Sequence, residues 1–308
     1  MTTFFSALNT TLLMFTFLLT GYFLKKRELL PASADTVLSR LENMVFVPAL
    51  VINTFMARFT LENLSLKWPY IALSLIVAAV TLPLSYLIGR LLGGDEAEER
   101  VYRYSTMIPN FSFFGIPLVR GTLGEEALFS YLIFCIPMYV ICYSIGTVWL
   151  IPSEKGAKMS LKSFCNPICI SLLIGIVLGL IGLPLPGFLG TALGQAADCM
   201  GPVAMLLTGF VVAGYGIRRL LSNRKVYIMA ALRLLAIPMV LTAVLRIFVK
   251  DPELLLYVLC FLAMPLGLNT IVIPAAYGGD TSTGASCALI SSTLAVITIP
   301  VLFLLFGF

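Results

Sequence analysis

Histidine does not occur in this sequence of 308 residues, and only 11% of the residues are charged. The absence of histidine removes the commonest general base and the commonest metal ligand. We therefore expect that the protein is not an enzyme and that it holds no metal ion and no cofactor. Soluble domains carry about 25% charged residues, whereas this chain is 59% hydrophobic with a mean hydropathy of +1.01. A soluble globule cannot bury so much apolar surface, which excludes a cytosolic enzyme and a disordered chain. The composition indicates an integral membrane protein.

The seven cysteines form no CxxC pair and no zinc-binding spacing, and most lie inside apolar runs. We therefore interpret them as buried thiols that pack as small apolar side chains. The net charge of +5 is not a nucleic-acid footprint, because the basic residues lie in short loops between apolar runs. The expected partners are the lipid bilayer and a small solute, without nucleic acid.

Apolar runs separated by charged or Gly/Pro-rich breaks predict ten membrane-spanning helices. About 20 apolar residues cross a bilayer as a helix, and lipid forces backbone groups to bond within the segment. The sequence lacks the alternating pattern of a membrane barrel. The predicted spans are 3–24, 36–57, 68–92, 101–123, 126–150, 164–183, 196–217, 226–249, 254–278 and 282–306. The expected fold is an all-α integral membrane protein.

Basic residues are distributed unevenly between the predicted loops. Fourteen of the 20 lysines and arginines lie at odd-numbered loops, and five lie at even-numbered loops. Positive residues favour the cytoplasm, so we expect both termini outside and a multi-pass protein of the plasma (inner) membrane. In the first run, Lys25, Lys26 and Arg27 follow the apolar stretch. This polarity is typical of a first membrane helix rather than a cleavable signal peptide.

The ten spans divide into two halves of five, joined by a short basic linker at 152–163. Because five is an odd number, the second half would enter the membrane with the opposite orientation. The sequence therefore predicts a 5+5 inverted repeat with its linker in the cytoplasm.

Spans 4 and 9 carry the strongest internal similarity, because each has an asparagine, a glycine and two prolines eight or nine residues apart. The shared residues are Pro109, Asn110, Gly115 and Pro117 in span 4, and Pro265, Gly267, Asn269 and Pro274 in span 9. Proline removes a backbone donor and clashes with the preceding turn, so we expect both helices to be broken. Broken helices in matching positions of two inverted halves indicate the binding site of a transporter.

The two breaks predict a site for an anion. Each half-helix N-terminus carries about half a positive charge and can hold a carboxylate without a buried arginine. Asn110 and Asn269 can add amide donors. The predicted substrate-binding residues are Pro109, Asn110, Ser112, Gly115, Pro117, Pro265, Asn269, Thr270 and Pro274. The alternative is that the prolines only kink packed helices and the asparagines join helices by hydrogen bonds.

The segment from Pro109 to Val119, followed by Gly124 and Ala127, resembles the span-4 signature of the auxin efflux carrier family. That family includes bacterial malate and malonate permeases and, more distantly, the plant PIN auxin exporters. Similar segments follow in family order along nearly the whole chain: Phe46–Leu50, Asn166–Pro167, Gly201–Pro202 with Leu206–Gly209, Arg233 with Pro238, and Asn269–Asp280. The short linker differs from the large hydrophilic loop of long plant members, which indicates a compact prokaryotic-type carrier.

The resemblance implies the crossover fold of bile-acid symporters, in which helices 4 and 9 cross at their breaks and bind the substrate. It also implies that a transport domain moves like an elevator against a scaffold. The scaffold would comprise 1–65 and 164–220, and the transport domain 66–151 and 221–308, with the linker 152–163 between the halves. Asn43, Pro48 and Asn53 of the scaffold would form part of the cavity wall.

Acidic residues that could couple transport to an ion are scarce in the spans. Asp198, at the outer start of span 7, is the first candidate and Glu42 is the second, although Asp198 also suits an exposed acid at a helix start. Arg233 is expected to snorkel to the cytoplasmic surface, with pairing to the substrate as the alternative. We expect facilitated or potential-driven movement of a small carboxylate without an obligatory sodium site.

Two other function classes fit the sequence less well than a transporter does. A channel needs a pore-lining polar ring, whereas inverted halves favour alternating access. An intramembrane aspartyl protease needs two carboxylates in one site, and the segment Tyr277–Asp280 supplies one. Gly175 and Gly179 form a GxxxG pattern in span 6, which suits packing within the chain or a homodimer through scaffold helices. The residues select no single acid as the substrate.

Overall fold

The computed structural model describes residues 2–151, 167–182, 185–276 and 279–308. These residues are mostly helical, and no strand is present among them. The α-helices are α1 (Thr2–Lys26), α2 (Ala34–Leu41), α3 (Val47–Arg58), α4 (Leu61–Leu92), α5 (Glu96–Met107), α6 (Gly115–Ile141), α7 (Thr147–Leu150), α8 (Pro167–Ile181), α9 (Gly187–Ala213), α10 (Ile217–Ser222), α11 (Arg224–Ala231), α12 (Ile237–Phe248), α13 (Pro252–Leu262), α14 (Asn269–Ala276) and α15 (Ser282–Phe306). The all-helical prediction is confirmed for this part of the chain. The predicted linker 152–163, Asn166, Tyr277 and Gly278 lie outside the described residues.

Six helical stretches of the described chain are long and apolar enough to cross a membrane. They are Thr3–Lys26, Ser65–Leu92, Gly115–Leu150, Gly187–Ala213, Arg224–Phe248 and Ser282–Phe306, and the apolar helices α8 and α13 are shorter. Large apolar side chains such as Leu91, Phe188 and Phe248 are exposed on the outside. Such a surface is unfavourable in water and suits lipid, which supports a multi-pass membrane protein.

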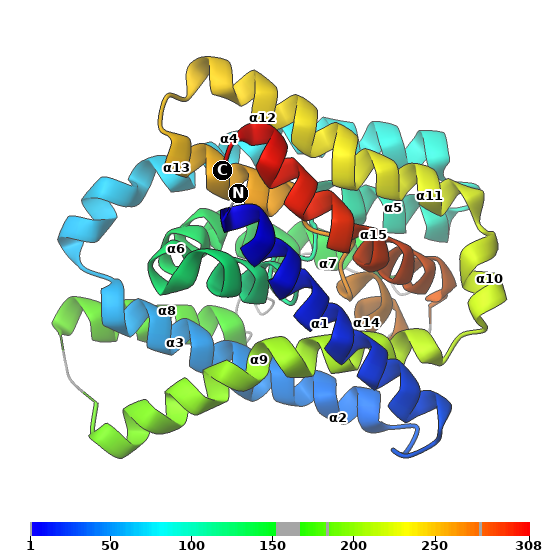
Figure 1. The fold of residues 1–308 in the computed structure, drawn as a ribbon, viewed down its shortest axis with the longest axis horizontal. Coiled ribbons are helices and arrows are strands. Elements are labelled where there is room, and N and C mark those ends of the chain that lie inside the picture. The colour runs from blue at the N-terminus through cyan, green and yellow to red at the C-terminus, as the bar shows by residue number, and fades with distance from the viewer. Residues whose placement is uncertain (1, 152–166, 183–184, 277–278) are drawn as a thin grey trace.

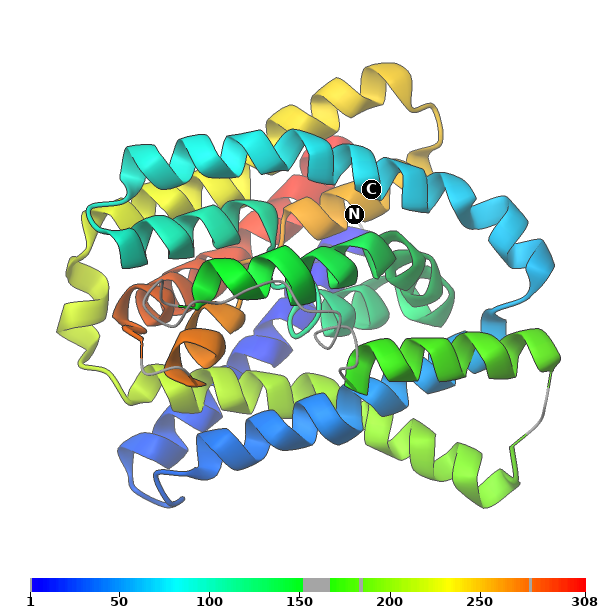
Figure 2. The same cartoon turned by 180° about the vertical axis from the view of Figure 1, so that it is seen from behind.

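Two groups of helices lie on either side of α1 (Figures 1 and 2). The first group contains α2, α3, α8 and α9, which pack on one another. The second contains α4, α5, α11, α12, α13 and α15, and α6 packs against α4 and α13 of this group. α1 contacts α9 on one side and α15 on the other, so it lies between the two groups.

Glycine lets α1 and α9 touch backbone to backbone. A Cβ atom built on Gly209 of α9 would lie 1.8 Å from the carbonyl oxygen of Leu18 in α1. Gly21 of α1 makes the corresponding approach to the carbonyl oxygen of Leu206, at 2.0 Å. Any side chain at either glycine would force the two helices apart.

The GxxxG glycines of α8 pack against α3. A Cβ on Gly175 would lie 2.9 Å from the Cβ of Phe55, and one on Gly179 would lie 2.7 Å from the carbonyl oxygen of Phe55. The pattern thus serves a contact inside the chain, and the homodimer stays a prediction.

Wide helical turns precede two prolines inside the membrane helices. The π-helical segments Glu42–Phe46 and Leu232–Ala236 are followed by Pro48 and Pro238. A proline clashes with the carbonyl four residues earlier, and a π-turn relieves that clash. The segments α2–α3 and α11–α12 therefore each continue as one rod. A third π-turn, Cys142–Gly146, joins α6 to α7.

Two predicted boundaries were wrong. α9 begins at Gly187 rather than at 196, because the glycine-rich segment there continues the helix instead of forming a loop. The helical segment α6 runs through the predicted turn between spans 4 and 5, with a kink at Gly124. The φ angle of Gly124 is 87°, a left-handed conformation that glycine adopts without strain.

Candidate functional site

The two helix breaks meet inside the protein. Helix α5 ends at Met107 before α6 begins at Gly115, and α13 ends at Leu262 before α14 begins at Asn269. Pro109 forms an isolated antiparallel bridge with Leu266, and the Asn110 N–H donates to the Pro265 carbonyl at 2.8 Å. We call residues 108–114 and 263–268, together with the helix ends that flank them, the crossover.

Neighbouring helices hold the crossover in this shape. The Leu266 N–H donates to Ser291 Oγ of α15 at 2.9 Å, and the Tyr131 hydroxyl of α6 donates to the Phe111 carbonyl at 3.0 Å. A Cβ on Gly115 would lie 2.3 Å from that hydroxyl, so only glycine fits beside it. The backbone groups freed by the prolines are thus partly satisfied within the protein.

The first-turn amides of both half-helices are largely engaged within the breaks. Gly115 N–H donates to the Asn110 carbonyl at 3.0 Å, and Ile271 N–H donates to the Leu268 carbonyl at 2.9 Å. Short-range turns therefore take up amides that could otherwise donate to a bound anion. The N-terminal dipoles remain, and the side chains of the crossover become the more important donors.

Four of the nine predicted substrate-binding residues line a common cavity, and the other five do not. Pro109, Asn110, Ser112 and Asn269 line one cavity of about 10 Å³, which has room for one water molecule at most. Thr270 lies in the turn at the start of α14, where its hydroxyl donates to the Gly267 carbonyl at 2.8 Å.

The remaining predicted prolines occupy other positions. Pro265 supplies the carbonyl that accepts from Asn110, and Pro274 is buried within α14. Pro117 lies in α6, and a Cβ on Gly201 of α9 would contact it at 3.0 Å. Pro117 therefore lies where the two groups of helices meet.

Two residues that the sequence did not single out hold the Asn269 amide. Its Nδ2 donates to the Tyr104 hydroxyl at 2.9 Å and to Cys142 Sγ at 3.4 Å. Tyr104 is fully buried at the end of α5, and Cys142 begins the π-turn after α6. Nothing in the local sequence marks either residue, because the contact joins positions 165 and 127 residues apart.

Ser112 is held in a similar way. Its Oγ accepts from the Tyr139 hydroxyl at 3.4 Å, and the Tyr139 ring packs edge-on against Phe111 at 4.8 Å between ring centres. Asn110 is 4% exposed, so its amide is enclosed by the crossover.

Arg233 does not snorkel to the surface, so that expectation was wrong. Its side chain is fully buried, and its guanidinium donates to the carbonyls of Thr106 at 3.2 Å and Phe261 at 3.3 Å. Thr106 lies in the last turn of α5 and Phe261 in the last turn of α13. The guanidinium therefore joins the ends of the two half-helices that lead into the crossover.

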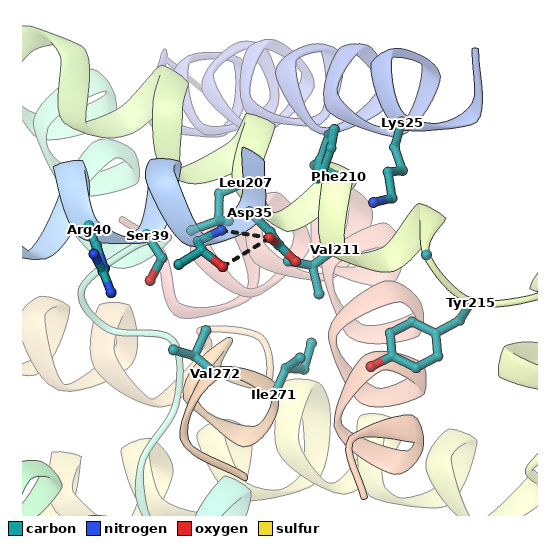
Figure 3. A pocket seen from close by; sticks show the side chains of 12 residues that line it. Lys25, Asp35, Ser39, Arg40, Leu207, Phe210, Val211, Tyr215, Ile271 and Val272 are labelled. Atoms are coloured by element: carbon teal, nitrogen blue, oxygen red, sulfur yellow. Dashed lines mark hydrogen bonds between the residues drawn. The ribbon is translucent and has the colours of Figure 1, made fainter. Parts of the chain in front are cut away.

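A larger cavity of about 640 Å³ lies between the first group of helices and α14 (Figure 3). It is lined by Lys25, Asp35, Thr36, Ser39, Arg40, Leu207, Phe210, Val211, Gly214, Tyr215, Ile271 and Val272. Ile271 and Val272 face the other side chains across the opening and come two and three residues after Asn269. We call this space the basic cavity, after Lys25 and Arg40.

The predicted wall residues lie on the same rod as part of the basic cavity but are not among its lining. Asn43 donates to the Ser39 carbonyl of its own helix at 2.8 Å, Pro48 is buried, and Asn53 is half-buried. The π-turn shifts the face of the rod at these positions. The lining residues of this rod include Thr36, Ser39 and Arg40, which lie three to seven residues before Asn43.

Asp198 forms an ion pair across the two groups of helices. Its Oδ1 lies 2.7 Å from Arg120 Nη2 of α6, and Arg120 also pairs with Glu125. Because α9 begins at Gly187, Asp198 lies well inside the helix rather than at its start.

Glu42, the second candidate for ion coupling, has no exposed surface. Both of its carboxylate oxygens lack a hydrogen-bond partner in the described part of the chain.

A model of the membrane transport protein family matches residues 6–303. The chain belongs to this family. It is the auxin efflux carrier family that the segments of the sequence resemble. One relative is an uncharacterized transporter of Methanothermobacter thermautotrophicus strain Delta H, which is 22% identical over 298 residues that cover 96% of this chain and 97% of the relative. Both findings support a membrane transporter rather than an enzyme.

Proposed function

We propose that the protein is a secondary transporter that moves a small organic carboxylate, held at the crossover. The observation that carries this proposal is the pairing of Pro109 with Leu266, which joins the two breaks and brings Asn110 and Asn269 to one cavity. The N-termini of α6 and α14 begin there, and together they contribute about one positive charge. An anion bound there needs no basic side chain in direct contact.

In this proposal the structure is an inward-facing state between transport events. The basic cavity opens at the end of the molecule that carries Lys25 and Arg40, which we expect to face the cytoplasm because basic residues favour that side. At the other end, the pair of Arg120 and Asp198 joins the two groups of helices. The crossover cavity would have to widen to admit a carboxylate, since it holds one water at most.

We further propose that the helices form ten spans in a 5+5 inverted repeat. The order of elements supports this arrangement, because one interrupted helix occurs fourth in each half. The matching pairs are α1 with α8, α2–α3 with α9, α4 with α11–α12, the α5–α6 break with the α13–α14 break, and the remainder of α6 with α15. The first group of helices would be the scaffold, and the second group with α6 and α14 would move against it like an elevator.

We also propose transport without an obligatory sodium site, in a plasma membrane protein with both termini outside. Asp198 is already paired with Arg120, so it is poorly suited to bind a transported cation. Glu42 is the buried acid that could take up a proton.

A thermal-shift screen against organic acids tests the proposed site. Purified protein is heated with malonate, malate, acetate and phenylacetate, and the same acids are tested on Asn110→Ala and Asn269→Ala. We expect one class of acid to raise the Tm of the unchanged protein and to have no effect on either variant. Asn63→Ala, in the first turn of α4, is the matched control and should keep the full response. A response that survives both crossover substitutions would remove these asparagines from the site.

A further inference from the structure

Arg233 is a buried cation that pairs with no acidic residue in the described part of the chain. It lies on the π-turn Leu232–Ala236, and its side chain is fully buried. None of the ion pairs among the described residues includes it. An unpaired charge inside a protein costs several kcal/mol unless dipoles or charges offset it. Something other than a carboxylate must therefore stabilise the guanidinium.

The stabilising groups are the C-terminal ends of two half-helices. The carbonyls of Thr106 and Phe261 belong to the last turns of α5 and α13, where carbonyls lack partners within the helix. Each helix C-terminus carries about half a negative charge. Two such ends together balance one guanidinium.

Carriers driven by an ion hold that ion in the same kind of place, at the carbonyl ends of broken half-helices. We propose that Arg233 is a resident cation of the crossover, which takes the position of a transported cation and lets the site bind a carboxylate without one. This inference rests on the function proposed above and adds a positioning residue to it. Arg233 acts through the half-helices and does not touch the substrate.

The charge balance has a consequence for transport. The C-terminal pair and the N-terminal pair of the crossover carry about −1 and +1, so the dipoles cancel and Arg233 leaves a net charge of about +1. A single bound carboxylate makes the loaded crossover neutral. Because Arg233 belongs to the second group of helices, it moves with the crossover in the proposed elevator movement. Membrane voltage then acts on the return of the empty carrier rather than on the loaded step.

The first test uses the unchanged protein and needs no substrate. The Tm is measured in equal concentrations of sodium, lithium, potassium and N-methylglucamine chloride. We expect the same Tm in all four salts, because Arg233 already occupies the place of a cation. A rise specific to sodium or lithium would overturn the inference while leaving the proposed carboxylate site intact.

The second test compares Arg233→Lys, which keeps the charge, with Arg233→Gln, which removes it. Binding of malonate and phenylacetate is measured by thermal shift in the absence of sodium. We expect Arg233→Lys to bind within about threefold of the unchanged protein and Arg233→Gln to bind at least tenfold more weakly. Sodium or guanidinium chloride should restore binding to Arg233→Gln alone. Arg246→Gln, an exposed arginine of the same rod, is the control and should behave as the unchanged protein.

The outcomes separate the two claims. Equal binding by Arg233→Gln without sodium would show that the charge does not act on the site, which overturns the inference. If Arg233→Gln does not fold, the salt comparison on the unchanged protein decides. A protein that binds no carboxylate in any salt would contradict the proposed function itself.

Discussion

Replacing Asp198 by asparagine removes an ion pair between α9 and α6 and should favour opening at that end. The paired side chains of Arg120 and Asp198 are 30% and 64% exposed, so solvent screens the attraction. Exposed pairs contribute about 0.2–1 kcal/mol. That energy corresponds to a change of up to about fivefold in the ratio of two conformations. Because Glu125 still pairs with Arg120 in the variant, no bare charge is left behind.

Accessibility of the basic cavity measures the change. Ser39→Cys places a thiol in that cavity, in a background where the exposed Cys199 is replaced by serine. Labelling by a membrane-impermeant maleimide in inside-out vesicles then reports the fraction of molecules with the cavity open. In Asp198→Asn the ratio of open to closed cavities should fall by up to about fivefold at low salt and recover in 1 M salt, where the screening length is about 3 Å.

Glu125→Gln is the matched control, because it removes the other partner of Arg120 without breaking a contact between the two groups. It should leave the labelling unchanged. Equal labelling of Asp198→Asn and the parent at low salt would refute a role of this pair in closing the outer end. An effect above about 2 kcal/mol that persists in 1 M salt would refute the view that the pair is a screened surface contact.

Two further predictions concern stability in detergent. Gly209→Ala should destabilise the protein by about 3 kcal/mol, because the new Cβ would meet the Leu18 carbonyl. Gly194→Ala on the same helix is the control, because its Cβ has open space, and it should be neutral or stabilising. Equal Tm values for both variants would contradict the close packing of α1 and α9. Burial alone would raise the pKa of Asp280, but hydrogen bonds from the Ser282 N–H and hydroxyl hold it below its ordinary value of 3.8. The stabilisation by Asp280 is therefore fully present above pH 3.8 and is lost as the pH falls through the lowered pKa. Asp280→Asn should have a lower Tm than the parent at pH 7 and the same Tm near pH 2. A series of Tm measurements against pH checks this.

The interruptions of the two helices could be predicted from local chemistry. Proline acts on its own backbone and the preceding turn, so Pro109 and Pro265 indicate where a helix ends without any knowledge of the fold. The all-helical structure likewise follows from the apolar runs and the demands of lipid. The glycine-rich start of α9 could not be predicted from helix propensity, which is weak there. Its side chains are largely exposed and its glycines have open space around them, so packing within the chain does not explain the helix. In lipid the backbone must bond within the segment, which favours a helix despite the glycines.

Residues that act through distant contacts could not be found in the sequence. Arg233 resembles a snorkelling arginine because its neighbours along the chain are apolar, and only the fold brings Thr106 and Phe261 to it. The same holds for Tyr104 and Cys142, whose sequence contexts give no sign that they hold Asn269. Local patterns report on backbone behaviour, whereas these contacts depend on how helices from both halves are arranged.

Counterflow in proteoliposomes tests the binding of a carboxylate at the paired helix breaks most directly. Vesicles are loaded with the unlabelled acid that stabilises the protein best, and entry of the same labelled acid is followed over time. A transient accumulation of label is expected for the unchanged protein and for Asn63→Ala, and none for the combined Asn110→Ala and Asn269→Ala variant. Entry without transient accumulation would indicate a channel, and accumulation of equal size in the combined variant would place the site elsewhere.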